Sequence, residues 1–475
     1  MQEYYRTTGD PAALKALERA ADAATADQVE TQKLRPHWGD PNTPWSVSCG
    51  IESALGALVV LGQQLGKPEY IAYAENIATN IPQHISPPSE TVLAGLAPMN
   101  YHEIPYGHHT HSYLSIAHGI VDLAMATGNP RFLLEAEKIF DDTLSTVWMN
   151  GNIPEGFGQL FEHRCEPCSM VDWVLLCLKL FDATGEPRYL DAAELSILNQ
   201  LPFCQDFKGG FAGWRNLDRH HWMDRNNWGT VADWCCSMHG GLAFAYVATH
   251  IVTRNQNALS VNLPLDTQVD LEPDGRAVRL SQHTQWVHRQ LRQTLSIANR
   301  EDADLPIKIR IPYWGEDPQL NLDGQRQKLN ARNGFAQVLI PARSEQTLEL
   351  SMRLRLIVIP PRKSILTLNR PAAAGKVTTQ ALQYGPFALM FYREMYPQIT
   401  ARDLSLAVLT DHGQPIVSSE LPDTWRASGA IPLLLKAQLN DTVHVWLTPC
   451  ANTTLAPFNV IDPYVMRFDQ VQIQP

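Results

Sequence analysis

The segment Thr127-Gly128-Asn129-Pro130-Arg131-Phe132-Leu133-Leu134-Glu135-Ala136 decides the fold of the first half of the chain, because its turn recurs three more times. The same Gly-x-Pro turn stands at Gly9-Asp10-Pro11, Gly66-Lys67-Pro68 and Gly185-Glu186-Pro187, and the four glycines are 57, 62 and 57 residues apart. A glycine that ends one helix in the left-handed conformation, followed by a proline in the first turn of the next, is typical of a helix-to-helix turn. Apolar residues three and four positions apart follow each proline, as in an amphipathic helix. Stacked helix pairs at this period predict a helical solenoid or a closed α/α toroid.

Near residue 256 the pattern changes from helical spacing to alternation. Segments such as Ile307-Lys308-Ile309-Arg310-Ile311 and Thr442-Val443-His444-Val445-Trp446-Leu447 alternate apolar with other residues. This period of two over many short segments predicts antiparallel sheet, most simply a β-sandwich. We therefore expect an α + β chain with three domains: an α/α toroid that carries the active site at 1–256, a β-sandwich at 257–362 and a second β-rich domain at 363–475.

Composition excludes several classes of partner. The chain has 475 residues and a net charge of -11, and its 38 Lys and Arg residues are dispersed, which argues against a nucleic-acid partner. No apolar run approaches the roughly 20 residues that cross a bilayer, and the first residues, Met1-Gln2-Glu3-Tyr4-Tyr5-Arg6, do not resemble an export signal. We expect a cytoplasmic protein without a membrane partner; the sequence does not indicate its oligomeric state.

Four of the eight cysteines lie in two short windows, Arg164-Cys165-Glu166-Pro167-Cys168 and Trp234-Cys235-Cys236-Ser237. Thiolates, with a carboxylate or a further sulfur, complete the tetrahedral shell that zinc prefers. Adjacent cysteines are unusual in a closed structural site, so an open metal site is favoured. Its candidate ligands are Cys168, Cys235 and Cys236, with either Glu166 or Cys165.

Two other interpretations of these cysteines remain. Cys165 and Cys168 could form a redox-active C-x-x-C disulfide, or the thiols could be inert. A redox C-x-x-C normally opens a helix after a strand in an α/β domain, whereas this one begins a helix in a helical domain. A metal site is therefore favoured over both.

Three more groups of residues could take part in the chemistry. His109 and His111 stand at the start of a predicted helix and are well placed to face a pocket, whereas His118, in its middle, is expected to be packed. Glu155 lies in the turn-rich segment 151–157, and cleavage of a glycosidic bond needs such a proton donor. Trp214 lies in the loop that leads to the cysteine pair, where a tryptophan face could stack on a sugar ring.

These segments resemble the motifs of glycoside hydrolase family 127, the zinc-dependent β-L-arabinofuranosidases and their relatives. The similar segments are His109–Gly119, Gly151–Phe157, Glu166-Pro167-Cys168, Cys235-Cys236, Lys308–Trp314 and Tyr384-Gly385-Pro386. The resemblance implies an (α/α)6 toroid followed by β-sandwich domains, and a Zn²⁺ cofactor. It favours Glu166 over Cys165 as a ligand.

Carried over position by position, the resemblance implies that Glu166, Cys168, Cys235 and Cys236 bind zinc, with Cys235 as the nucleophile. Glu155 would be the general acid/base, and His109 would contact the sugar. The expected activity is that of a retaining glycoside hydrolase. The expected partner is a carbohydrate, an arabinofuranoside or a related plant sugar.

The chain departs from the family pattern at three places. Ser237-Met238-His239 follows the double cysteine where the family has Pro-x-Asn, and the histidine helix begins His109-Thr110-His111 rather than His-Ala-Asn. These changes bear on the floor of the pocket and on the substrate. Only four hairpin turns precede the β-region, whereas a six-hairpin toroid needs roughly two more. We therefore expect a chain that lacks N-terminal hairpins or a shortened toroid.

Two other functions remain open from the sequence. The first is a sugar epimerase or lyase on an α/α toroid, with His109, His111 or His239 as the base that transfers the proton. The second is a catalytically inactive carbohydrate-binding homologue that keeps zinc only for its structure. Activity that survives a Cys235→Ala substitution would favour the epimerase or lyase.

Overall fold

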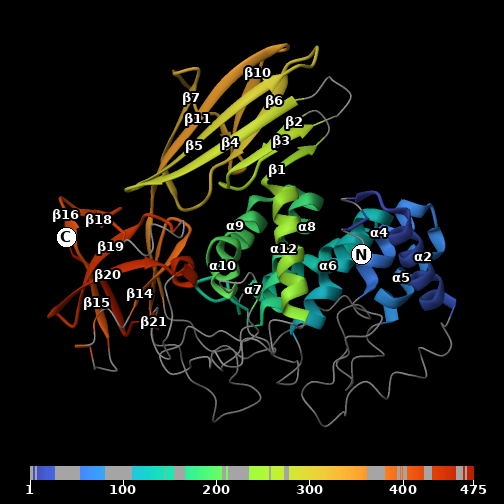
Figure 1. Ribbon diagram of the computed structural model, residues 1–475, viewed down its shortest axis with the longest axis horizontal. Coiled ribbons are helices and arrows are strands. Elements are labelled where there is room, and N and C mark those ends of the chain that lie inside the picture. Colours follow the sequence, from blue (N-terminus) through green and yellow to red (C-terminus); the bar gives the residue numbers. More distant parts are fainter. Residues whose placement is uncertain are drawn as a thin grey trace, which may run out of the picture.

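Helices form the first half of the described chain and strands the second half (Figure 1). The computed structural model describes residues 4–5, 8–26, 54–80, 110–144, 146–153, 166–205, 210–211, 235–255, 258–271, 278–360, 380–392, 396, 398–399, 404–421, 430–455, 464–465 and 468–474. The helices are α2 (Pro11–Ala26), α4 (Leu55–Leu65), α5 (Pro68–Asn80), α6 (Thr110–Thr127), α7 (Pro130–Leu144), α8 (Pro167–Thr184), α9 (Pro187–Leu195), α10 (Leu201–Cys204) and α12 (Cys235–Ile251). A π-helix, Ser196–Gln200, joins α9 to α10. Within these ranges, no helix is both long and apolar enough to span a membrane.

The predicted helix-to-helix turns are confirmed. The four repeated glycines have positive φ values of 67° to 72°, and a helix begins at the proline two residues after each of them. The N–H of Gly185 donates to the carbonyl of Phe181 at 2.7 Å, which closes the last turn of α8. A Cβ atom at any of these glycines would meet nothing within 4 Å, so the backbone conformation alone requires glycine.

Helix α8 lies at the centre of the helical region. Every residue from Pro167 to Phe181 is buried, and α6 and α12 both pack against this helix. A helix that is apolar on nearly all sides belongs to the interior. The neighbouring pair α4 and α6 meets through two glycines, because a Cβ on Gly119 would lie 2.7 Å from the backbone nitrogen of Gly56.

Two sheets follow the helices and share one apolar core. The five-stranded sheet has the order β1 (Val252–Asn255), β2 (Ala258–Val261), β6 (Leu305–Arg310), β10 (Phe335–Ile340), β9 (Ala331–Arg332). The six-stranded sheet has the order β3 (Thr267–Leu271), β4 (Val278–Val287), β5 (Gln290–Asn299), β11 (Ser344–Leu354), β7 (Gly315–Leu322), β8 (Gln325–Gln327). In the hairpin of β4 and β5, Val278 pairs with Asn299 and Val287 with Gln290. Alternate side chains of β5 are buried, as the period of two predicted.

A further sheet lies toward the C-terminus. Its order is β12 (Leu356–Ile359), β13 (Ala381–Tyr384), β14 (Phe387–Tyr392), β20 (Val443–Pro449), β19 (Leu434–Leu439), β15 (Ser405–Val408), β22 (Gln470–Ile473), with β18 (Val417–Ser418) on β19 and β21 (Tyr464–Val465) on β14. Most described strand pairs are antiparallel, as expected, but β2 with β6 and β15 with β22 are parallel. The predicted domain limits at 256 and 362 stay a prediction.

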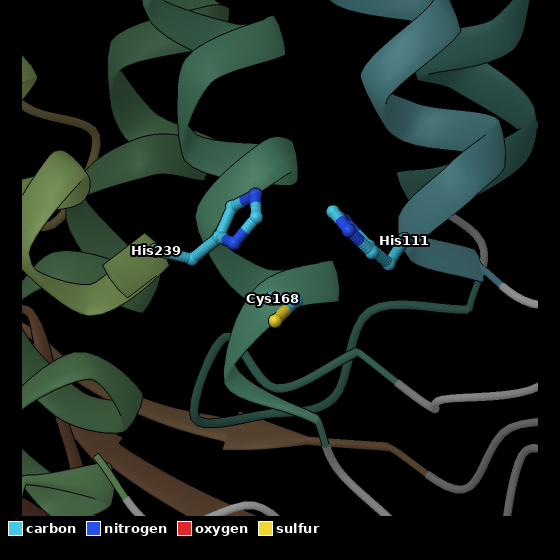
Figure 2. Close-up of side chains that lie close together, drawn as sticks. All are labelled: His111, Cys168 and His239. Atoms are coloured by element: carbon cyan, nitrogen blue, oxygen red, sulfur yellow. The ribbon is translucent and has the colours of Figure 1, made fainter. Parts of the chain in front are cut away.

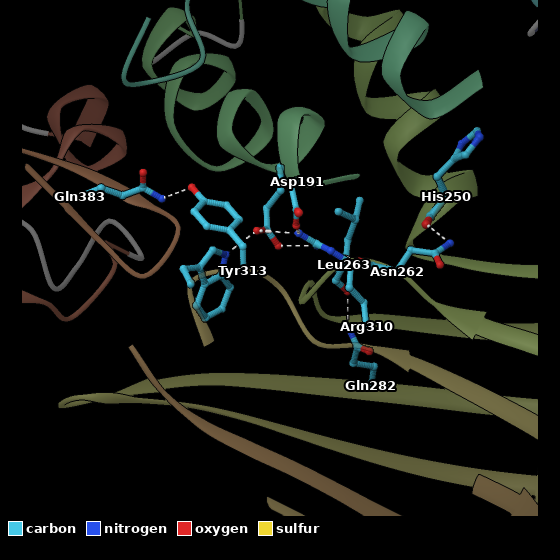
Figure 3. A network of polar contacts seen from close by, with 10 residues as sticks. Asp191, His250, Asn262, Leu263, Gln282, Arg310, Tyr313 and Gln383 are labelled. Atoms are coloured by element: carbon cyan, nitrogen blue, oxygen red, sulfur yellow. Dashed lines mark hydrogen bonds and ion pairs between the residues drawn. The ribbon is translucent and has the colours of Figure 1, made fainter. Parts of the chain in front are cut away.

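A buried ion pair joins the helices to the first β-region (Figure 3). The guanidinium of Arg310, on β6, donates to Glu194 on α9 at 2.8 Å and to Asp191 at 2.6 Å. The indole N–H of Trp314 donates to the same Glu194 carboxylate at 2.6 Å. The Asn199 side chain makes a similar link to the C-terminal sheet, because it accepts from the Ala388 N–H at 2.8 Å. The helical region is thus fixed to both groups of strands by buried polar contacts.

Candidate metal centre and active site

The first turns of three helices bring potential metal ligands together. His111 is the second residue of α6, Glu166 and Cys168 flank the first residue of α8, and Cys236 is the second residue of α12. Glu166 is the N-cap of α8 with an extended backbone (φ -101°, ψ 127°), and Pro167 begins the helix with a preset φ. Because the N-terminal end of a helix carries partial positive charge, the α8 and α12 termini favour carboxylate and thiolate groups at these positions.

Glu166, Cys168 and Cys236 form a compact and fully buried group. Their ligand atoms all lie within 4.8 Å of one another. The sulfurs of Cys168 and Cys236 are 3.7 Å apart, and the Cys236 sulfur is 4.0 Å from Oε1 of Glu166. The hydroxyl of Ser169 donates to the other Glu166 oxygen at 3.4 Å, which helps to hold the carboxylate in place. These three residues could hold a metal ion.

Two histidines approach Cys168 from the neighbouring helices. His111 on α6 and His239 on α12 extend toward each other, with the Cys168 sulfur close to both (Figure 2). Their ring centroids are 4.5 Å apart and the rings are nearly perpendicular. Potential ligand atoms of His111, Cys168 and His239 also lie within 4.8 Å of one another, and Cys168 therefore belongs to two such groups.

Behind His111, a row of charged groups continues into the helical interior. Nδ1 of His111 contacts Oδ2 of the buried Asp172, and Nε2 of His118 lies 3.5 Å from the other oxygen of this carboxylate. The Lys179 ammonium is 3.2 Å from Nδ1 of His118 and donates to Asp122 at 2.5 Å. The row therefore runs between α6 and α8.

The pKa values in this row follow from burial and pairing. Burial alone would raise the pKa of Asp172, but His111 and then His118 hold it well below its ordinary value. Burial, followed by the charge of Lys179, lowers the pKa of His118. Burial alone would also lower the pKa of Lys179, but the Asp122 carboxylate outweighs this effect and raises it. The Asp172 carboxylate and the Lys179 ammonium are therefore charged here at neutral pH.

Some of the predicted site residues can be placed, and others cannot. Glu166, Cys168 and Cys236 come together, and His111 lies beside Cys168. Cys235 begins α12, but its side chain lies outside the described part of the chain. Glu155, His109, Trp214 and Cys165 also lie outside it. The catalytic, sugar-binding and metal-binding roles of all these residues stay predictions.

Two residues of this region had no place in the predicted metal site. The sequence indicates His239 only as a candidate base, although it stands three residues after Cys236 on α12. Asp172 was not considered, although it is the first acidic residue after Cys168 and stands four positions from it on α8. That spacing puts both side chains on one face of a helix, which is the signal that could have identified Asp172.

Comparisons with known proteins agree on one family. The profile of the β-L-arabinofuranosidase GH127 catalytic domain matches residues 1–249, and that of the GH127 middle domain matches residues 258–354. No curated protein matches the chain.

Solved structures support the fold. A GH127 β-L-arabinofuranosidase from Geobacillus stearothermophilus T6 is 16% identical, with a TM-score of 0.69 over 99% of this chain and 78% of its own. A second GH127 β-arabinofuranosidase is 17% identical, with a TM-score of 0.68 over 99% of this chain and 76% of its own. The predicted α/α toroid followed by β domains is thereby confirmed. The chain belongs to the GH127 family of β-L-arabinofuranosidases and is a glycoside hydrolase that acts on carbohydrate.

Proposed function

We propose that this protein is a retaining β-L-arabinofuranosidase with a zinc-bound cysteine nucleophile. Glu166, Cys168, Cys235 and Cys236 would hold the ion, Cys235 would also attack the sugar, and Glu155 would be the acid/base. The observation that carries the proposal is the buried group of Glu166, Cys168 and Cys236 at the starts of α8 and α12. It stands within the segment that matches a glycosidase catalytic domain, and Cys235 precedes Cys236 directly.

The donor atoms of this group fit zinc. Two sulfurs bound to one tetrahedral zinc ion at about 2.3 Å would lie about 3.8 Å apart, and the sulfurs of Cys168 and Cys236 are 3.7 Å apart. A sulfur and a carboxylate oxygen on the same ion would be about 3.6 Å apart, close to the 4.0 Å between Cys236 and Glu166. A disulfide between Cys168 and Cys236 would instead need sulfurs about 2 Å apart. Thiolates with one carboxylate are a donor set that suits zinc.

When bound, zinc keeps its cysteine ligands deprotonated at neutral pH. In the first step, the Cys235 sulfur forms a bond to the anomeric carbon while the bond from this carbon to the leaving oxygen breaks. Glu155 gives its proton to that oxygen. In the second step, Glu155 takes a proton from water, the water oxygen bonds to the anomeric carbon, and the carbon–sulfur bond breaks. Two displacements at one carbon retain its configuration.

The family name supports an arabinofuranoside as substrate. His109 and Trp214 remain our candidates for contacts with the sugar, one through a hydrogen bond and the other through stacking. A screen of nitrophenyl glycosides, with the β-L-arabinofuranoside among them, would identify the sugar.

The test uses reduced protein that is purified without chelator. We expect tightly bound zinc, and release of nitrophenol that falls by about 10²-fold to 10⁴-fold in a Glu155→Gln variant which keeps its zinc. A Cys235→Ala variant should lose turnover.

Cys177→Ala is the matched control, because this buried cysteine on α8 stands apart from the metal group and burial raises the pKa of its thiol. It should keep both zinc and activity. Reduced protein without zinc, or a Cys235→Ala variant with full turnover, would contradict the proposal.

A further inference from the structure

His111, Cys168 and His239 form a second group of metal-ligating atoms beside the proposed zinc site. The three residues come from three different helices, α6, α8 and α12, and their potential ligand atoms lie within 4.8 Å of one another (Figure 2). Pairs of nitrogen and sulfur ligands on one tetrahedral zinc ion are about 3.5 Å apart. The three residues could therefore hold an ion if their ligand atoms, which all lie within 4.8 Å of one another, approached to about this separation.

Asp172 orients His111 in the way that metal-ligating histidines require. Nδ1 of His111 contacts the carboxylate of Asp172, which is buried on the next turn of α8 after Cys168. A proton on Nδ1 that is shared with a carboxylate leaves Nε2 as the nitrogen that can coordinate an ion. Carboxylates hold the second ring nitrogen of metal-bound histidines in this manner and raise the basicity of the ligand.

The buried charges beneath His111 also favour a cation. The carboxyl groups of Asp172 and Asp122 are both buried beneath His111, and the Lys179 ammonium pairs with Asp122 at 2.5 Å. Asp172 contacts His111 through one carboxylate oxygen and lies 3.5 Å from Nε2 of His118 through the other. A buried carboxylate is costly unless a positive charge compensates it.

We propose that His111, Cys168 and His239 bind a second divalent metal ion of borderline softness, such as Zn²⁺, joined to the first ion through the shared Cys168 thiolate. The proposal rests on the proposed function through this shared ligand. Two imidazole nitrogens and one thiolate suit zinc or cobalt better than the hard cations magnesium and calcium.

Three protein ligands leave one tetrahedral position open, as in catalytic rather than structural zinc sites. A water molecule or a hydroxyl group of the sugar would fill it. In this second site, His111 binds the metal ion and does not contact the sugar directly.

Metal content tests the proposal directly. Reduced protein is loaded with Zn²⁺, freed of excess metal by gel filtration, and its zinc is measured by mass spectrometry. We expect two ions per chain in the wild type, and one in both His111→Asn and His239→Asn. His412→Asn removes an imidazole that is almost fully exposed, and this control should keep two ions. His111 and His239 belong to different helices, so if one variant does not fold, the zinc content of the other still tests the proposal.

Cobalt titration gives a second readout. Thiolate-to-cobalt absorption should grow in two steps in the wild type, and the second step should disappear in either histidine variant. An Asp172→Asn variant should bind the second ion about 10-fold to 100-fold more weakly and the first ion unchanged. One ion in the wild type overturns the second site and leaves the proposed function intact. No ion in the wild type overturns both proposals, and two ions in both histidine variants overturn the assignment of the ligands.

Discussion

Glu135 offers a quantitative test of how burial governs stability in the helical domain. It lies on the buried face of α7 with Phe132, Ala136 and Ile139, its side chain is 0% exposed, and neither carboxylate oxygen has a hydrogen-bond partner among the described residues. The Lys138 ammonium lies 3.8 Å from its Oε2. Burial raises the pKa of Glu135 from 4.5 to about 7, and Lys138 offsets this effect only in part.

The raised pKa fixes the sign of the pH dependence. Between pH 4.5 and about 7, the folded protein keeps the proton on Glu135 while the unfolded chain releases it. The contribution of protonated Glu135 to the free energy of unfolding is therefore fully present below pH 4.5 and is lost as the pH rises toward 7. At about 1.4 kcal/mol per pKa unit, the loss amounts to about 3 kcal/mol.

A Glu135→Gln substitution removes this dependence, because glutamine is neutral at every pH. We expect the variant to gain about 3 kcal/mol relative to the wild type between about pH 4.5 and about pH 8. The free energy of unfolding would be measured in urea by circular dichroism and tryptophan fluorescence, and compared where both probes give one transition. Glu186→Gln, at an exposed position before α9, is the control and should follow the wild type at each pH. A Glu135→Gln difference that stays constant across this range would refute the reasoning.

Two substitutions, each with a matched control, test the link between the helices and the strands and the packing of the helices, with the free energy of unfolding measured in urea. Arg310→Ala should cost about 3–5 kcal/mol because it leaves the buried Glu194 carboxylate without its cationic partner. Arg279→Ala removes an exposed ion pair with Asp270 and should cost less than about 1 kcal/mol. Equal costs would contradict the role of burial. Gly119→Ala should cost about 1–3 kcal/mol because its Cβ would lie 2.7 Å from a backbone nitrogen of α4. Gly241→Ala, on α12, is the control: its Cβ would meet nothing within 4 Å, and the substitution should be neutral or stabilising. If Gly241→Ala cost more stability than Gly119→Ala, the close approach of α4 and α6 would be contradicted.

The helix-to-helix turns were predictable because their cause is local. A glycine with positive φ and a proline in the next first turn act through their own backbone, so Gly128 and Gly185 mark the helix ends wherever the helices pack. The alternating strands were predictable for the same reason. The parallel pairing of β2 with β6 was not, because it depends on which strands the chain brings together after long connections.

The candidate site was predictable where its members are close in sequence. Cys168 and the two residues Cys165 and Glu166 lie within four positions, which made them candidate ligands, and the family resemblance favoured Glu166 over Cys165. His111 and His239 are separated by most of the helical domain, and only the packing of α6 and α12 on α8 brings their rings together. Glu135 shows a further limit of prediction from sequence. A glutamate is expected at an exposed position, whereas its place three residues after Phe132 puts it on the buried face of α7.

One face of α8 connects the metal groups to the charged interior. Cys168, Asp172 and Lys179 are separated by four and seven residues, so their side chains follow one side of a helix that is buried from Pro167 to Phe181. A helix in such surroundings can hold charged groups only if each one is compensated. Lys179 finds Asp122 on α6, and Asp172 contacts His111 on the same helix. The charge pattern of α8 therefore selects α6 as its neighbour and aims the His111 ring at Cys168. The contacts that pack α6 against α8 therefore also place His111 beside Cys168.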